Sequence, residues 1–122
     1  MNTEAKLKAL VVEDEALVAM LIEDILADMG HEVAAVAGRL EQALTLIQTA
    51  DFDFAVLDLN LNGVRTYPVA EALVSRGKPF MFATGYGSAG LDDPWRRYPV
   101  VQKPFTPEDL ARAIEQAMTP RA

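Results

Sequence analysis

The chain contains no cysteine and only one histidine, His31. A disulfide framework, a thiol nucleophile and a zinc site with thiolate ligands are therefore excluded. A single histidine also cannot build a histidine-rich metal site, and we assign no role to His31. A metal ion bound here would be a hard cation with oxygen ligands, Mg²⁺ or Ca²⁺.

The sequence also lacks an excess of basic residues and any long apolar run. Eleven Lys and Arg stand against 18 Asp and Glu, and the formal net charge is −7. Non-specific binding to nucleic acid or to anionic membranes needs a basic patch, so we expect neither partner. Residues 1–8 have no signal-peptide pattern, and no stretch has the length of a membrane span. We therefore expect a cytoplasmic protein.

The length and composition predict one folded domain. Hydrophobic residues make up 51% of the 122 residues, which is enough for a core. We expect a single domain over residues 1–122, with its core at about residues 6–119 and no output domain.

Strand-like and helix-like segments alternate along the chain. Short apolar runs predict strands, and periodic apolar spacing predicts helices. The predicted strands cover residues 7–12, 32–37, 52–57, 80–83 and 100–101. The predicted helices cover residues 16–29, 40–47, 68–76 and 107–118. Because the strands are mostly apolar and show no polar alternation, this pattern indicates an α/β domain with a parallel sheet and helices on both faces.

The segment 85–99 does not fit the alternation. It contains three glycines and two prolines, which disfavour a helix, so we expect a short or mobile helix at best. Within it we predict that Trp95 is a half-buried anchor of the loop and that the charges of Arg96 and Arg97 are solvated. The alternative is that these three residues form a docking patch for a partner.

Polar residues stand at the ends of four predicted strands. Glu13 and Asp14 follow the first strand, Asp58 the third, Thr84 the fourth and Lys103 the fifth. In an open parallel sheet the carboxyl ends of the strands lie at one edge, where ligands bind. We expect these five side chains to share one cleft.

The chemistry of these residues suits phosphoryl transfer. Clustered carboxylates repel one another unless a cation such as Mg²⁺ is present. Asp58 can attack phosphorus and form an acyl phosphate. Such transfers need charge neutralisation, which Lys103 can supply, while the Thr84 hydroxyl can donate to a phosphate oxygen.

Glu13-Asp14, Asp58, Thr84 and Lys103-Pro104-Phe105 resemble, in order and spacing, the signature of response-regulator receiver domains. The resemblance implies a doubly wound, flavodoxin-like sheet of five parallel strands in the order 2-1-3-4-5. It implies that Asp58 is the phosphoacceptor and that Lys103 contacts the phosphoryl group. Thr84 becomes the switch hydroxyl, and the Lys103–Pro104 peptide bond is expected to be cis.

The same resemblance implies a Mg²⁺ cofactor. Glu13, Asp14 and Asp58 would bind it together with the backbone carbonyl of Asn60. The phosphodonor would be a histidine kinase or a histidine phosphotransfer protein.

The sequence departs from the common receiver pattern at one position. Val100 stands where the family has its switch aromatic, three residues before the lysine, so the usual ring rotation cannot occur. Tyr98 lies two residues earlier; two residues along a strand keep the same face but a different depth, so Tyr98 is a poor substitute.

The run Phe82-Ala83-Thr84-Gly85-Tyr86-Gly87 further resembles the motif of the FAT-GUY receivers, an atypical subfamily described mainly in alphaproteobacteria. Those receivers lack the switch aromatic and pair with kinases of the HWE or HisKA2 type. Together with the glycines that follow, the resemblance implies that the segment after Thr84 changes its order on phosphorylation.

The function implied is phosphorelay signalling through protein–protein contacts, and we do not classify the chain as an enzyme. An aspartyl-phosphate phosphohydrolase is a second hypothesis, but Asn60 stands where its acid–base Asp is needed. A flavin binder is a third, but residues 13–15 are acidic where a phosphate loop is needed. A pseudo-receiver that is not phosphorylated is a fourth, and the complete set of site residues disfavours it.

Overall fold

A sheet of five parallel strands forms the centre of the molecule. The computed structural model describes residues 6–85 and 90–119. The strands are β1 (Lys8–Val12), β2 (Glu32–Ala37), β3 (Phe54–Asp58), β6 (Phe80–Thr84) and β7 (Val100–Gln102). Their order in the sheet is β2-β1-β3-β6-β7, and all neighbouring strands are parallel. This order confirms the predicted 2-1-3-4-5 topology.

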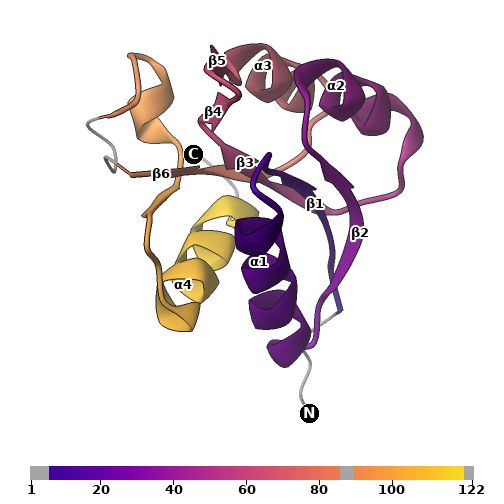
Figure 1. Cartoon of the computed structure of the whole chain (residues 1–122), viewed down its shortest axis with the longest axis vertical. Helices are drawn as coiled ribbons and strands as arrows, with labels where there is room; N and C mark the ends of the chain where they lie inside the picture. Colours follow the sequence, from indigo (N-terminus) through magenta and orange to yellow (C-terminus); the bar gives the residue numbers. More distant parts are fainter. Residues whose placement is uncertain (1–5, 86–89, 120–122) are drawn as a thin grey trace.

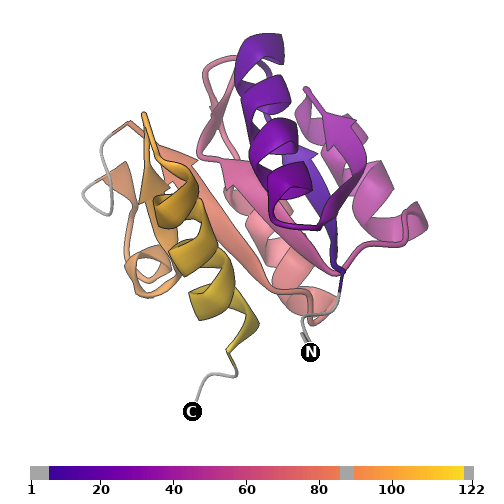
Figure 2. The same cartoon turned by 90° about the horizontal axis from the view of Figure 1, so that it is seen from below.

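Two pairs of helices cover the two faces of this sheet (Figures 1 and 2). Helices α1 (Ala16–Asp28) and α4 (Pro107–Met118) lie on one face, and α2 (Leu40–Thr49) and α3 (Tyr67–Ser75) lie on the other. Successive strand side chains point to opposite faces. Val56 of β3 therefore packs in the apolar cluster under α1 and α4, and Leu57 packs in the cluster under α2 and α3.

Local residues fix several of the helix ends. Gly30 and Gly77 follow α1 and α3 with φ of 86° and 68°, a region that glycine enters without strain. At the start of α4, the Thr106 hydroxyl accepts the Asp109 N–H at 3.1 Å, and the Asp109 carboxylate accepts the Thr106 N–H at 3.0 Å. This reciprocal capping box, with Pro107 at the first helical position, fixes the end of the loop after β7.

A two-strand hairpin that the sequence analysis did not predict follows β3. Its antiparallel strands are β4 (Asn60–Leu61) and β5 (Val64–Arg65). Asn62 and Gly63 join them, with φ of 51° and 84°. Two positive φ angles are typical of a type I′ turn, for which Asn-Gly is the preferred pair. The turn places a hairpin directly beside Asp58.

Between β6 and β7 the described residues form a short 3₁₀-helix, η2 (Trp95–Arg97), and no α-helix over 90–99. Trp95 is half-buried against the core, as predicted. Tyr98 follows η2 and precedes β7, so it does not lie on the strand of Val100. Its ring stacks on Phe80 at 4.9 Å between ring centroids instead.

Membrane spans need long apolar helices, and the helices of residues 6–85 and 90–119 are short. None is long and apolar enough to cross a bilayer.

Candidate functional site

The carboxyl edge of the sheet brings the predicted site residues together. Glu13 directly follows β1, Asp58 ends β3 and Thr84 ends β6. The Lys103 N–H donates to the Thr84 carbonyl at 2.9 Å, which continues the β6–β7 pairing beyond the end of β7. A cavity of about 370 Å³ opens at this edge, and Asp14, Asp58, Thr84 and Lys103 line it.

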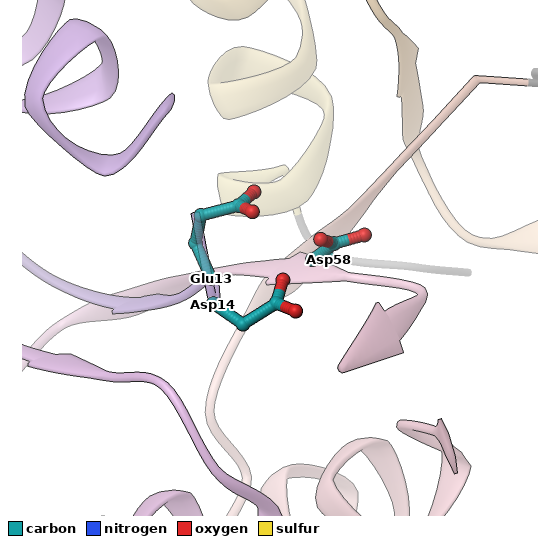
Figure 3. Close-up of side chains that lie close together, drawn as sticks. All are labelled: Glu13, Asp14 and Asp58. Atoms are coloured by element: carbon teal, nitrogen blue, oxygen red, sulfur yellow. The ribbon is translucent and has the colours of Figure 1, made fainter. Parts of the chain in front are cut away.

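Three carboxylates lie close enough to share one cation (Figure 3). Glu13, Asp14 and Asp58 each offer an oxygen, and these oxygens lie within 4.8 Å of one another. Glu13 and Asp14 come from the same turn, and both carboxylates point toward Asp58 in Figure 3. Glu13 and Asp58 are buried, whereas Asp14 is exposed. An all-oxygen donor set with one solvent-facing ligand fits a hydrated Mg²⁺ ion.

Lys103 is the cation that the chain itself supplies to this cluster. Its Nζ donates to Glu13 Oε1 at 3.1 Å and to Asp58 Oδ2 at 3.2 Å. Burial lowers the pKa of Lys103, but the negative charges and hydrogen bonds of Asp58 and Glu13 outweigh burial and raise it above 10.5. Lys103 is therefore positively charged in this site.

One lysine does not balance the negative charge of the cluster. Burial and, next, the negative charge of Asp58 together raise the pKa of Glu13 to about 7. Hydrogen bonds from the Glu15 N–H and from Lys103 oppose the shift without cancelling it. Because Glu13 resists ionisation even beside a lysine, a further cation would be electrostatically favourable at this site.

The two oxygens of the Asp58 carboxylate have different partners. The Asn60 N–H donates to Oδ1 at 3.2 Å, and Lys103 donates to Oδ2. The carboxylate is thus oriented from two sides. Asn60 itself lines the cavity from the β4–β5 hairpin, where its backbone carbonyl is predicted to act.

Sequence reasoning missed Asn62 as a residue of this site. Its backbone N–H donates to Asp14 Oδ2 at 3.1 Å, although the two residues are 48 positions apart. Asn62-Gly63 is a typical turn sequence, but only the folded hairpin shows that the backbone N–H of Asn62 faces Asp14.

Thr66 was missed as well. Its side chain is fully buried, and its hydroxyl lies 2.7 Å from the Asp58 carbonyl oxygen. Its position just before a helix with a proline in the first turn is typical of a helix cap, and no sequence signal pointed to Asp58.

The remaining predicted residues have these positions. Thr84 is buried at the end of β6. Val100 is half-buried opposite Phe82 in the β6–β7 pairing. The Lys103–Pro104 peptide bond is cis, as predicted. Tyr86 lies outside the described residues.

Comparison with known proteins agrees with this architecture. The family model of the response regulator receiver domain matches residues 9–115. The solution structure of SdrG from Sphingomonas melonis Fr1 is 38% identical, with a TM-score of 0.86 over 96% of this chain and 100% of that one. The receiver domain of the PhyR response regulator from Erythrobacter litoralis is 28% identical, with a TM-score of 0.83 over 97% of both chains.

Curated relatives give the same result. The two-component response regulator PhoP of Pseudomonas aeruginosa is 36% identical in an alignment 115 residues long, which covers 85% of this chain and 48% of that protein. The chain spans about half the length of the curated relatives that it matches. With the family model, the five-stranded topology and the residues at the strand ends all in agreement, the chain belongs to the family of response regulator receiver domains.

Proposed function

We propose that Asp58 accepts a phosphoryl group from a phosphohistidine protein in a two-component phosphorelay. The observation that carries the proposal is the environment of the Asp58 carboxylate. One oxygen accepts a hydrogen bond from the Lys103 ammonium, and the other accepts one from the Asn60 N–H. The carboxylate lines a cavity that can admit a phosphoryl group.

The proposed step is an in-line substitution at phosphorus. A carboxylate oxygen of Asp58 forms the new O–P bond, while the P–N bond of the donor phosphohistidine breaks and its electron pair stays on the ring nitrogen. With acetyl phosphate as donor, a P–O bond breaks and acetate leaves. Lys103 and the Thr84 hydroxyl would then bind phosphoryl oxygens, which neutralises part of their charge.

Mg²⁺ would be held by Glu13, Asp14, Asp58 and the backbone carbonyl of Asn60. When bound, it supplies positive charge to the transferred phosphoryl oxygens. The close approach of the three carboxylates and the raised pKa of Glu13 support this assignment.

The donor we propose is a histidine kinase, of the HWE or HisKA2 type, or a phosphotransfer protein. The run from Phe82 to Gly87 and the valine at position 100 support membership of the FAT-GUY receivers. A relative that is 38% identical, SdrG, has a BeF₃-activated conformation, and beryllium trifluoride on a carboxylate has the tetrahedral shape of a phosphoryl group. These features support control by phosphorylation.

In this proposal the chain turns over no substrate except its phosphodonor, so it is not an enzyme in the usual sense. Phosphorylation adds a charge of about −1.5 to −2 and changes the contacts of the chain with a downstream protein. The proposed location is the cytoplasm, where such donors present their phosphohistidine.

Intact-mass measurement after incubation with acetyl phosphate and Mg²⁺ tests the proposal. Wild type should gain one phosphoryl group, and Asp58→Asn should gain none. Asp53→Asn is a matched control on the loop before β3 and should be labelled like wild type. The proposal fails if wild type takes up no phosphoryl group from acetyl phosphate or from a phosphorylated kinase, or if Asp58→Asn is labelled equally.

A further inference from the structure

The hydroxyl of Thr66 has an unusual partner for a residue at the start of a helix. A threonine that precedes a helix ordinarily accepts an N–H of the first turn. Thr66 makes no such bond with α3. Its fully buried Oγ1 lies 2.7 Å from the Asp58 carbonyl oxygen and 3.2 Å from that of Leu59. The start of α3 is thus fastened to the backbone of the phosphoacceptor.

A second contact fastens the same two segments. The Thr66 N–H donates to the Leu59 carbonyl at 2.9 Å, and the Thr66 carbonyl accepts the N–H groups of Val69 and Ala70 in the first turn of α3. Because backbone and side chain both hold Thr66 to residues 58–59, a shift of the backbone at Asp58 moves the start of α3 with it.

Tyr67, the next residue, holds the segment between β6 and β7. Its ring stacks on Trp95, with 5.6 Å between the ring centroids and 6° between the planes. Its hydroxyl oxygen accepts the Asp92 N–H at 2.8 Å. One residue therefore binds the segment 91–98 at two points, through a ring and through a hydrogen bond.

The segment 91–98 folds as a small unit around these contacts. The Trp95 N–H donates to the Asp92 carbonyl at 2.7 Å, and Arg96 Nε donates to the Leu91 carbonyl at 2.8 Å. Leu91 is buried, and Trp95 packs edge-to-face on Phe82 of β6. Tyr67 can therefore displace the segment as a whole rather than a single side chain.

We propose that Thr66 and Tyr67 carry the state of Asp58 to the segment 91–98. The inference rests on the proposed function and names the route by which phosphorylation would be read out. The contacts run without interruption from the Asp58 carbonyl through Thr66 and Tyr67 to Trp95. Val100 has no ring, so the rotation of a switch aromatic cannot carry the signal. In this proposal the contacts of Tyr67 carry it instead, from the α3 side of the segment. Coupling between two sites requires an element whose arrangement responds to both, and the packed segment 91–98 is proposed as that element.

Trp95 is the only tryptophan of the chain, so its fluorescence reports directly on this segment. The experiment records Trp95 emission before and after phosphorylation by acetyl phosphate and Mg²⁺. Intact mass on the same samples gives the phosphorylated fraction. Wild type should show a spectral change in proportion to that fraction.

Four variants separate coupling from simple packing. Tyr67→Leu and Thr66→Val should lose the emission change per phosphorylated molecule, and Thr66→Ser should restore it. Tyr98→Leu is the matched control. It removes another ring near Trp95, at 5.4 Å between centroids, but leaves Thr66 and Tyr67 in place. Its resting emission should differ from wild type, and the change on phosphorylation should persist.

Two results would overturn the inference. One is an unchanged emission response in phosphorylated Tyr67→Leu, and the other is phosphorylated wild type without any response. A thermal melt shows whether Thr66→Val folds. If it does not fold, the comparison of Tyr67→Leu with Tyr98→Leu decides the question. A wild type that takes up no phosphoryl group is recognised from the mass spectrum first. That result overturns the proposed function, and this inference with it.

Discussion

The ammonium of Lys103 donates to the carboxylate of Glu13 across 3.1 Å, although the two residues are 90 positions apart. The Glu13 side chain is 1% exposed, so the lysine is held where water hardly screens it. The same ammonium reaches Asp58. Lys103 is therefore in place beside the phosphoacceptor before any phosphoryl group arrives.

Removing this charge should slow phosphorylation. We expect Lys103→Gln to lower the initial rate of labelling by acetyl phosphate by about 10²-fold, the usual cost of losing one charge-stabilising donor. Intact mass against time measures the rate. Lys78→Gln is the control, because Lys78 is also half-buried and donates to a backbone carbonyl, that of Phe52, before β6. Equal rates for Lys103→Gln and wild type would show that Lys103 is not needed.

Mg²⁺ should stabilise the fold through the acidic cluster. Binding to the native state at ten times the dissociation constant adds about 1.4 kcal/mol of stability. For a chain of this size that raises Tm by about 5 °C. We expect the rise in wild type, its reversal by EDTA, and its loss in Asp14→Asn. Asp24 is an exposed carboxylate on α1, away from the cluster, so Asp24→Asn should respond like wild type. A full Mg²⁺ response in Asp14→Asn would contradict the assignment of Asp14 as a ligand.

The capping box of α4 should make part of the stability depend on pH. The hydrogen bonds of Thr106, and then the charge of Arg112, lower the pKa of Asp109 below 3.8. A carboxylate whose pKa is lower in the folded state stabilises that state at pH values above its ordinary pKa. This contribution is lost as the pH falls through the pKa of the folded state. Asp109→Asn should therefore have a lower urea midpoint than wild type at pH 7, and the gap should narrow below pH 3.8. If the difference in urea midpoint between wild type and Asp109→Asn is the same at both pH values, the ionised Asp109 carboxylate is not the origin of the pH dependence.

Features encoded by neighbouring residues could be predicted from the sequence. Strands β3 and β6 are each a buried apolar run that ends at a polar residue, so Asp58 and Thr84 could be placed at strand ends from the sequence. The end of α1 at Gly30 and the capping box of α4 are likewise local. The parallel sheet then places the strand ends together, because its geometry allows no other arrangement of the carboxyl ends.

Features that depend on distant contacts could not be predicted. Strands β4 and β5 have two residues each, too few for any periodicity. Thr66 has the local signature of a helix cap, but its buried hydroxyl bonds to Asp58 instead, so the tertiary contact overrides the local preference. The stack of Tyr67 on Trp95 joins residues from α3 and η2, and no spacing rule connects them.

The exposed face of α1 leads to the last prediction. Leu17, Met20 and Leu21 are 80%, 56% and 47% exposed. Their spacing places them on one side of the helix, whose first turn follows the Glu13-Asp14 pair of the site. Exposed apolar side chains that gather beside a reactive group mark a contact surface. We expect the phosphodonor protein to cover this face.

The double variant Leu17→Gln/Leu21→Gln should separate a protein donor from a small one. Each leucine covered by a partner contributes about 1.5 kcal/mol or more, so transfer from a phosphorylated kinase or phosphotransfer protein should fall by about 10-fold or more. Labelling by acetyl phosphate should stay at the wild-type rate, since α1 does not contact that donor. Val74→Gln, which changes an exposed apolar residue of α3 on the opposite face, should leave both rates unchanged. A parallel fall with both donors would mean that the substitutions disturb the site itself. Undiminished transfer from the protein donor would mean that it docks elsewhere.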